Sequence, residues 1–328
     1  MTTRTSSLIP VTILTGFLGA GKTTLLNHIL KAPHGHRIAV IENEFGEAGI
    51  DNELLVQDSN EQIIEMNNGC ICCTVRGDLV RILGELAAKK KAGKLSFDHI
   101  VIETTGLADP APVAQTFFVD EVVMQNYLLD AIVTLVDAKH APEQLDEHHE
   151  AQEQVGFADR LLLTKTDLVS AEETAALRLR LARINPRAKM AEAHHGVAAI
   201  EDLLDIRGFN LNAILDIEPA FLTDVDHEHD DDVTSFVFRE DRPLDLERLE
   251  DFLSSIVQVY GTQMMRYKGV LNVQGKSQRI VFQGVHMLMG ADTGSTWKNG
   301  EPRSSKMVFI GRDLPREILE NGLHQCVA

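Results

Sequence analysis

Nine consecutive residues near the start of the chain constrain its fold more than any other segment. Residues 16–24 read Gly-Phe-Leu-Gly-Ala-Gly-Lys-Thr-Thr and fit the pattern GxxxxGK[ST]. The β-branched run 11–14 precedes them, and leucine and isoleucine recur at helical spacing over 25–30. Strand, glycine loop and helix in this order are the context in which the pattern is a phosphate-binding P-loop. The sequence therefore predicts a buried strand that leads into a phosphate site at the start of a helix.

The residue types of this loop indicate its chemistry. Glycines let successive backbone N–H groups converge on one point, and the following helix adds its positive N-terminal end. A polyphosphate fits there, with Lys22 at the β- and γ-phosphates and the Thr23 hydroxyl on Mg²⁺. The residues expected to bind the nucleotide here are Gly16, Gly19, Ala20, Gly21, Lys22, Thr23 and Thr24. A chance glycine turn is the alternative, and the flanking pattern argues against it.

Length and charge limit the classes of partner. The chain has 328 residues, which suggests a large domain plus a smaller one. It carries 31 Lys and Arg against 49 Asp and Glu, and the net charge of −18 disfavours nucleic acid and anionic membranes while it suits cations. No apolar run approaches the roughly 18 residues of a membrane span, and the start of the chain lacks a signal-peptide pattern. We therefore expect a cytoplasmic protein.

Strand-like and helix-like segments alternate after the P-loop. Apolar runs that predict strands occur at 37–41, 63–64, 99–102, 130–137, 160–164 and 188–193. This alternation is typical of a doubly wound α/β sheet, whose ligands bind at the carboxyl ends of the strands.

The periodicity fades from about residue 207, and strand-like runs resume at Thr234. The later part predicts strands at 234–239, 264–273, 278–285 and 306–310, a helix with apolar residues from Leu246 to Ile256, and a last helix from Pro315. We expect Met264, Met265 and Trp297 to pack in the core or at an interface. The predicted domains are a P-loop domain over 1–210, an acidic and histidine-containing linker over 211–232, and a smaller α+β domain over 233–328.

Two polar segments at strand ends extend the nucleotide site. The strand at 99–102 leads into Glu103, whose carboxylate can hold Mg²⁺, and Gly106 lets a backbone N–H approach the γ-phosphate. Lys22, Thr23 and Glu103 are therefore the residues expected to act in catalysis.

The strand at 160–164 leads into Lys165-Thr166-Asp167. A carboxylate at Asp167 can accept both the N1–H and N2–H₂ donors of guanine, with the stem of Lys165 along the ring. Adenine lacks this donor pair, so GTP is expected rather than ATP. The alternative is an ordinary turn, in which Ser170 and Glu173 form a capping box for the next helix.

Three of the four cysteines lie close together, at Cys70, Cys72 and Cys73. Adjacent cysteines do not close an unstrained disulfide in an ordinary trans backbone, which favours a metal site. Thiolates select Zn²⁺ or Cu(I), other divalent ions stay open, and zinc is the preferred interpretation. Glu42 and Glu47 follow a neighbouring strand and could complete the ligand set. A metal that only stabilises the loop, redox-sensing thiols and plain packing are the alternatives.

Five segments in this order resemble the CobW-like P-loop GTPases: GFLGAGKTTLLNHIL, IENEFGE, NNGCICC, IETTG and LLLTKTD. The motifs cover about the first 210 residues, while RYKGVL, FQGV and SSKMVFIG resemble that family's C-terminal domain. The resemblance implies a family that is similar to the GTPases that insert nickel into hydrogenase and urease. Members of this family are thought to deliver cobalt, zinc or iron to target proteins. It also implies that Glu42, Glu47 and Cys72 are metal ligands, with Cys70 and Cys73 as companions. The histidine tract at 227–232 is shorter than in some members.

Together these features predict a GTP-hydrolysing metallochaperone whose nucleotide state controls metal binding and docking to a metalloprotein client. The expected cofactors are GTP or GDP, Mg²⁺, and Zn²⁺ or another transition metal such as Co²⁺. Turnover of GTP to GDP and phosphate is expected to be slow, because no separate nucleophile is visible. A dimer that depends on metal or nucleotide is a further expectation. The alternatives are a metal sensor or store with incidental GTP binding, and a P-loop small-molecule kinase, in which the guanine pattern is not expected.

Overall fold

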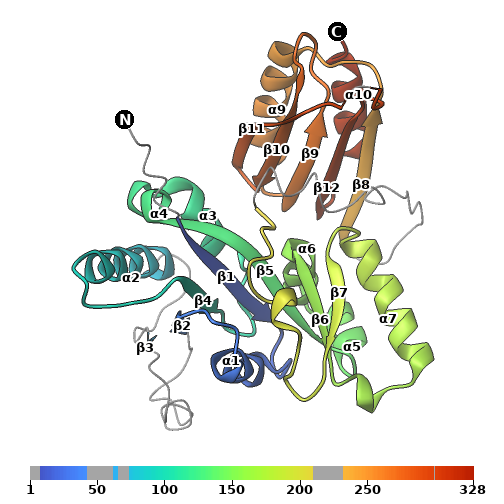
Figure 1. Cartoon of the computed structure of the whole chain (residues 1–328). Helices are drawn as coiled ribbons and strands as arrows, with labels where there is room; N and C mark the ends of the chain where they lie inside the picture. The colour runs from blue at the N-terminus through green and yellow to red at the C-terminus, as the bar shows by residue number, and fades with distance from the viewer. Residues whose placement is uncertain (1–7, 43–61, 66–73, 210–231, 299) are drawn as a thin grey trace.

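The structure, a computed structural model, describes residues 8–42, 62–65, 74–209, 232–298 and 300–328. Within these residues the chain forms two β-sheets, each packed against helices (Figure 1). The first sheet has seven parallel strands, and the second has five antiparallel strands. The predicted doubly wound α/β fold with a smaller C-terminal α+β domain is confirmed.

The order of strands in the parallel sheet is β3-β2-β4-β1-β5-β6-β7. The strands are β1 Ile9–Gly16, β2 Ile38–Glu42, β3 Gln62–Glu65, β4 His99–Glu103, β5 Tyr127–Asp137, β6 Arg160–Thr164 and β7 Lys189–Ala193. The chain builds β2, β3 and β4 on one side of β1 and then β5, β6 and β7 on the other. Ligands of such sheets bind where the order reverses, at the carboxyl ends of the strands. Gly16, the last residue of β1, lies at that edge.

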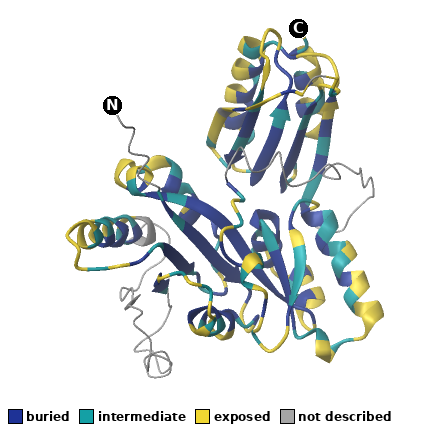
Figure 2. Cartoon of the chain, in the orientation of Figure 1, coloured by how far each residue is buried: buried dark blue, intermediate teal, exposed yellow. Residues whose placement is uncertain are grey.

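Two apolar clusters cover the two faces of this sheet. One contains Leu25 and Leu26 of α1 (Lys22–Lys31) together with Leu14 of β1. The other contains Val11 and Ile13 of β1 together with residues of the helices opposite. Neighbouring residues of β1 thus pack on opposite faces of the sheet. Because both faces are buried, the strands form continuous apolar runs in the sequence. Figure 2 shows the inner strands almost uniformly buried.

The other helices of the first domain connect the strands. They are α2 Thr74–Lys91, α3 Ala111–Val119, α4 Glu121–Asn126, α5 Ala141–Glu147, α6 His149–Phe157 and α7 Ala171–Ile184, with short 3₁₀ helices at Thr166–Leu168 and Ile200–Asp202. Ser170 and Glu173 form the capping box of α7 that the sequence indicated. Among the described residues, no helix combines the length and the hydropathy that a membrane crossing requires.

The antiparallel sheet of the C-terminal domain has the order β11-β10-β9-β12-β8. Its elements are β8 Val233–Glu240, α9 Leu246–Tyr260, β9 Arg266–Leu271, β10 Gln278–Val285, β11 Leu288–Thr296, β12 Ser305–Arg312 and α10 Arg316–Gln325. Leu253 of α9 and Leu323 of α10 join the strands in one core. Trp297, Met264 and Met265 are buried, as expected. The predicted linker at 211–232 lies outside the described residues except for Asp232.

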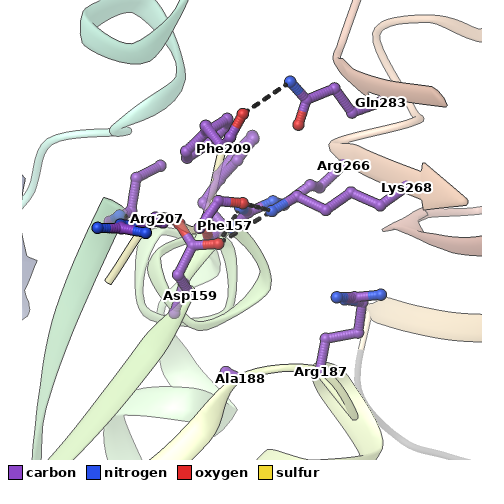
Figure 3. A network of polar contacts seen from close by, with 12 residues as sticks. Phe157, Asp159, Arg187, Ala188, Arg207, Phe209, Arg266, Lys268 and Gln283 are labelled. Atoms are coloured by element: carbon purple, nitrogen blue, oxygen red, sulfur yellow. Dashed lines mark hydrogen bonds and ion pairs between the residues drawn. The ribbon is translucent and has the colours of Figure 1, made fainter. Parts of the chain in front are cut away.

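A buried polar network joins the two domains (Figure 3). The Asp159 carboxylate accepts a hydrogen bond from Lys268 Nζ at 3.0 Å, pairs with Arg266, and accepts the backbone N–H of Ile132 at 2.9 Å. The ring of Phe209 covers both cations, with Arg266 Cζ and Lys268 Nζ at 4.5 and 4.6 Å from its centre. One anion is thus shared by two cations from β9.

The two cations respond differently to this burial. Arginine keeps its charge in proteins, whereas a buried lysine can lose its proton. Burial, aided by the charge of Arg266, lowers the pKa of Lys268 well below its usual value. Burial alone would raise the pKa of Asp159, but Arg266 and Lys268 hold it below its usual value. Asp159 therefore stays ionised between the domains.

Gly208→Ala is expected to loosen this network. An added Cβ at residue 208 would lie 2.4 Å from Cγ of Asp159, whose carboxylate is held by several donors and cannot move aside without losing them. We expect a loss of about 1–3 kcal/mol in the free energy of unfolding, measured by urea titration. Gly290→Ala is the matched control, because no atom lies within 4 Å of its added Cβ. Equal unfolding midpoints for the two variants would contradict the prediction.

Candidate nucleotide site

The P-loop lies between β1 and α1 at the carboxyl edge of the parallel sheet (Figure 1). Gly16, Gly19 and Gly21 have φ angles of 139°, 76° and 95°, a region that residues with side chains rarely adopt. At Gly16 a Cβ would also lie 2.5 Å from the carbonyl oxygen of Leu135. Gly21 is the N-cap of α1, and no side chain caps the helix there. The backbone N–H groups at this end are therefore available to an anion, as a phosphate site requires.

Lys22 is folded inside the loop that precedes it. Its Nζ donates hydrogen bonds to the carbonyl oxygens of Gly16 at 2.8 Å and Phe17 at 3.3 Å. Burial lowers the pKa of Lys22 below its usual value, and the charge of Glu103 opposes that shift. The loop thus holds an ammonium group in the place where the sequence predicts the β- and γ-phosphates.

Glu103 ends β4 and lies against the first turn of α1. The Thr23 hydroxyl donates a hydrogen bond to Oε1 of Glu103 at 3.1 Å. A hydroxyl beside a carboxylate provides the oxygen donors that Mg²⁺ prefers. Glu42, the last residue of β2, pairs in register with Glu103, so the two side chains leave the same face of the sheet. Glu103, one of the predicted Mg²⁺ residues, and Glu42, the first residue of the predicted metal set, therefore end adjacent strands.

The segment after Glu103 lies against the P-loop. The backbone N–H of Thr104 donates to the carbonyl of Leu14 at 3.0 Å. A Cβ on Gly106 would lie 2.8 Å from the backbone nitrogen of Leu18 and 2.6 Å from its Cδ2. A residue with a side chain does not fit there. This close approach is what a backbone N–H needs in order to reach a terminal phosphate bound to the P-loop.

The predicted guanine residues follow β6. The Thr164 hydroxyl donates to the carbonyl of Ala20 at 3.0 Å, so the end of β6 lies beside the P-loop. Lys165 has a left-handed backbone, with φ of 56°, and its Nζ donates to Oδ2 of Asp137 at 2.6 Å. Asp167 lies two residues further in a 3₁₀ turn and is exposed to solvent. The structure thus brings Lys165 and Asp167 to the same sheet edge as the P-loop.

Asp137 is a site residue that sequence reasoning missed. It ends β5, is 1% exposed, and accepts hydrogen bonds from Lys165 and from Nδ1 of His140, the latter at 2.8 Å. Burial alone would raise its pKa, but these hydrogen bonds hold the pKa below its usual value. The ionised carboxylate therefore fixes the direction of the lysine. A sequence signal existed, because Asp137 ends an apolar strand as Glu103 does.

Most of the predicted metal ligands lie outside the described residues: Glu47, Cys70, Cys72 and Cys73. Glu42 is described, and it pairs in register with Glu65, the last residue of β3. The segments that carry the other predicted ligands therefore begin at adjacent strands on one edge of the sheet. Within the part of the chain that the structure covers, no group of three or more His, Cys, Asp or Glu side chains is arranged to hold a metal. The metal site stays a prediction.

Two family descriptions match the chain. Residues 10–192 match "CobW/HypB/UreG, nucleotide-binding domain", and residues 233–327 match "Cobalamin synthesis protein cobW C-terminal domain". The chain is 46% identical over 310 residues to the zinc chaperone YjiA of Escherichia coli, covering 94% of this chain and 96% of the relative. It is 35% identical over 348 residues to the zinc-regulated GTPase metalloprotein activator 1 of Schizosaccharomyces pombe, covering 95% and 81%.

A solved structure gives the same result. The fold is similar to the crystal structure of the Zn(II)-bound YjiA GTPase from E. coli, with a TM-score of 0.81 and 39% identity over the superposed residues. The superposition covers 98% of this chain and 99% of the other. The resemblance drawn from the five motifs is thereby confirmed, and the chain belongs to the CobW/HypB/UreG family of nucleotide-binding proteins.

Proposed function

We propose that this chain is a GTP-hydrolysing metallochaperone that binds a transition metal, with zinc favoured, and delivers it to a metalloprotein client. Relatives support the metal and the nucleotide, since they are named as a zinc chaperone and as a zinc-regulated GTPase metalloprotein activator. The observation that carries the proposal is the pairing of Glu42 with Glu103 on adjacent strands. This pairing places Glu103, a proposed Mg²⁺ residue, beside Glu42, the first of the proposed ligands of the transported metal.

On the nucleotide side, each residue has a distinct role in the proposal. Lys22 and the P-loop N–H groups bind the β- and γ-phosphates of GTP, and Thr23 and Glu103 hold Mg²⁺, which when bound neutralises phosphate charge. Gly106 presents a backbone N–H to the γ-phosphate. Lys165 and Asp167 bind guanine. Turnover is slow, as in related GTPases without a supplied arginine finger, because positioning of the attacking water must do most of the work.

On the metal side, the transported ion is bound by carboxylates and thiolates from two segments. Glu42 ends β2 and Glu47 follows it in the sequence, while Cys70, Cys72 and Cys73 follow β3 in the sequence. In P-loop GTPases, a segment near the γ-phosphate orders around the triphosphate and Mg²⁺ and is released after hydrolysis. A change of this kind beside Glu42 alters the spacing between the carboxylates and the thiolates, and so alters metal affinity.

Zinc affinity is therefore expected to depend on the bound nucleotide. Zinc titrations of the apo, GDP-bound and non-hydrolysable-GTP-bound protein should give affinities that differ by roughly 5- to 150-fold, the usual range of coupling between two sites. Reciprocity requires zinc to change GTP affinity by the same factor. Cys72→Ala should remove most of this linkage while GTP binding itself persists, because Cys72 lies outside the phosphate loop.

The fourth cysteine supplies the matched control. Cys326 is 2% exposed in the core of the C-terminal domain, where its Sγ donates to the carbonyl of Gly322 at 3.2 Å. Cys326→Ser should leave both the zinc affinities and their dependence on nucleotide unchanged. Three identical zinc affinities in the unmodified protein would leave a structural metal site and would rule out a nucleotide-controlled metallochaperone.

A further inference from the structure

The buried residue Gln154 lies beneath the loop that carries Gly106. Its side-chain amide nitrogen donates hydrogen bonds to the carbonyl oxygens of Gly106 and Ala108, both at 3.1 Å. The side chain comes from α6, 48 and 46 residues away along the chain from the two carbonyls. Gln154 is 1% exposed, so the N–H groups of its side-chain amide are shielded from water and donate to this loop instead.

The helix that presents Gln154 is firmly anchored below the loop. The Thr134 hydroxyl of β5 donates to the backbone carbonyl of Gln154 at 2.8 Å. Val155 and Phe157, the next apolar residues of α6, are buried in the larger core cluster. An amide on such a rigid element can hold a loop in one position.

Hydrogen bonds hold the loop at both ends, and Gln154 contacts the part between them. At its start, the Thr104 hydroxyl donates to the Thr15 hydroxyl at 2.7 Å. At its end, the backbone N–H of Ala111 donates to Asp109 Oδ1 at 2.8 Å, where α3 begins. Gly106 and Ala108 lie between these anchors, and the amide of Gln154 ties down both of their carbonyls. Because the peptide unit is planar, these two hydrogen bonds fix the peptide planes that follow Gly106 and Ala108, whose N–H groups belong to Leu107 and Asp109. The N–H of Gly106 is then separated from a fixed peptide plane by only the φ and ψ torsions of Gly106.

We propose that Gln154 is a positioning residue for recognition of the third phosphate. It holds the Gly106 loop against the P-loop, so that the backbone N–H at Gly106 is already directed at the γ-phosphate before GTP arrives. This proposal rests on the proposed GTPase function. It adds that one buried amide controls the preference for GTP over GDP, because GDP binds without a γ-phosphate and does not use this loop.

The test replaces the amide with a side chain of similar length that cannot donate. Gln154→Met should lower the affinity for a non-hydrolysable GTP analogue by about 10- to 30-fold, the range expected for two lost hydrogen bonds, and leave GDP affinity within about twofold. Affinities are measured by titration calorimetry. The Michaelis constant for GTP should rise and kcat should fall, because the loop must be ordered at each turnover.

A second buried glutamine on the same helix supplies the matched control. Gln152 is 4% exposed, and it donates to the carbonyl of Leu145 and accepts the N–H of Val233, both contacts away from the Gly106 loop. Gln152→Met should cost comparable stability and leave the ratio of GTP-analogue to GDP affinity unchanged. If Gln154→Met lowers both affinities equally, or leaves the ratio at the value of the control, Gln154 has only a structural role and the proposal is overturned.

Amide hydrogen exchange separates this proposal from the proposed function. In nucleotide-free protein, Gln154→Met should speed exchange of the backbone N–H groups of residues 104–109, including the N–H of Ala108 that donates to the carbonyl of Thr105 at 3.1 Å, and Gln152→Met should not. Unchanged exchange in that segment would overturn the positioning role even if GTP binds. Faster exchange in a protein that binds neither GTP nor GDP would instead reject the proposed GTPase function and leave the support of the loop established.

Discussion

Lys22→Ala is expected to abolish measurable GTP hydrolysis while the protein stays folded. The ammonium of Lys22 lies inside the P-loop, within hydrogen-bond distance of the carbonyls of Gly16 and Phe17. A cation held there stabilises the negative charge that develops on the transferred phosphate, and loss of one such group costs about 100- to 1,000-fold in rate. Added to the slow turnover that we propose, this loss takes phosphate release below detection. The measurement is phosphate release under saturating GTP.

A second lysine on the same helix provides the control. Lys31 is the last residue of α1 and is exposed to solvent, so Lys31→Ala removes the same charge without touching the P-loop. We expect this variant to retain turnover and to lose only a few tenths of a kcal/mol of helix stability. Both variants should keep the circular dichroism spectrum of the parent. Parental turnover in the Lys22 variant would reject the role of Lys22 in catalysis.

The phosphate loop could be predicted from sequence because its constraint is local. Gly16, Gly19 and Gly21 stand where φ is positive, and three glycines at this spacing before a lysine and a threonine are typical of a phosphate-binding loop. The parallel sheet could be predicted equally well, since strands buried on both faces form continuous apolar runs in the sequence. Local conformational and hydrophobic rules therefore predicted most of the first domain.

Strand β11 was not predicted, and its composition explains why. The segment Leu288–Thr296 contains two glycines and an aspartate and has no alternation of apolar residues. It is a strand because it returns antiparallel along β10, with Leu288 opposite Val285 at the hairpin. Pairing with a neighbour overrides a weak local preference, and sequence periodicity does not report such pairing.

The polar residues that support the site were missed for a related reason. Asp137 contacts Lys165 across 28 residues of sequence, and Gln154 contacts Gly106 across 48. In the sequence, Gln154 lies in a polar helical stretch and looks like a surface residue, although its side chain is buried. The motifs name the groups expected to bind the ligand, whereas the groups that orient them are visible only once the fold brings them together.

The second large effect concerns the choice of base. If Asp167 pairs with guanine, the unmodified protein should prefer GTP to ATP by up to about 10⁴-fold, because adenine leaves the carboxylate without its two donors. Asp167 is exposed in a 3₁₀ turn, so its replacement does not disturb a core. Equal affinity for GTP and ATP in the unmodified protein would reject the guanine assignment.

Asp167→Asn should change the preferred base from guanine to xanthine, an effect that a folding defect cannot produce. The asparagine amide offers one acceptor and one donor, so its N–H group meets the N2–H₂ donor of guanine and weakens GTP binding. Xanthine carries a carbonyl oxygen in place of that amino group, and it matches the asparagine amide. We therefore expect GTP affinity to fall and xanthosine triphosphate affinity to rise in the same variant, measured by competitive displacement of a labelled nucleotide. Asp146→Asn, at an exposed carboxylate of α5, makes the same charge change and should alter neither affinity. A variant that loses GTP without gaining the xanthine nucleotide would place the carboxylate of Asp167 away from the base.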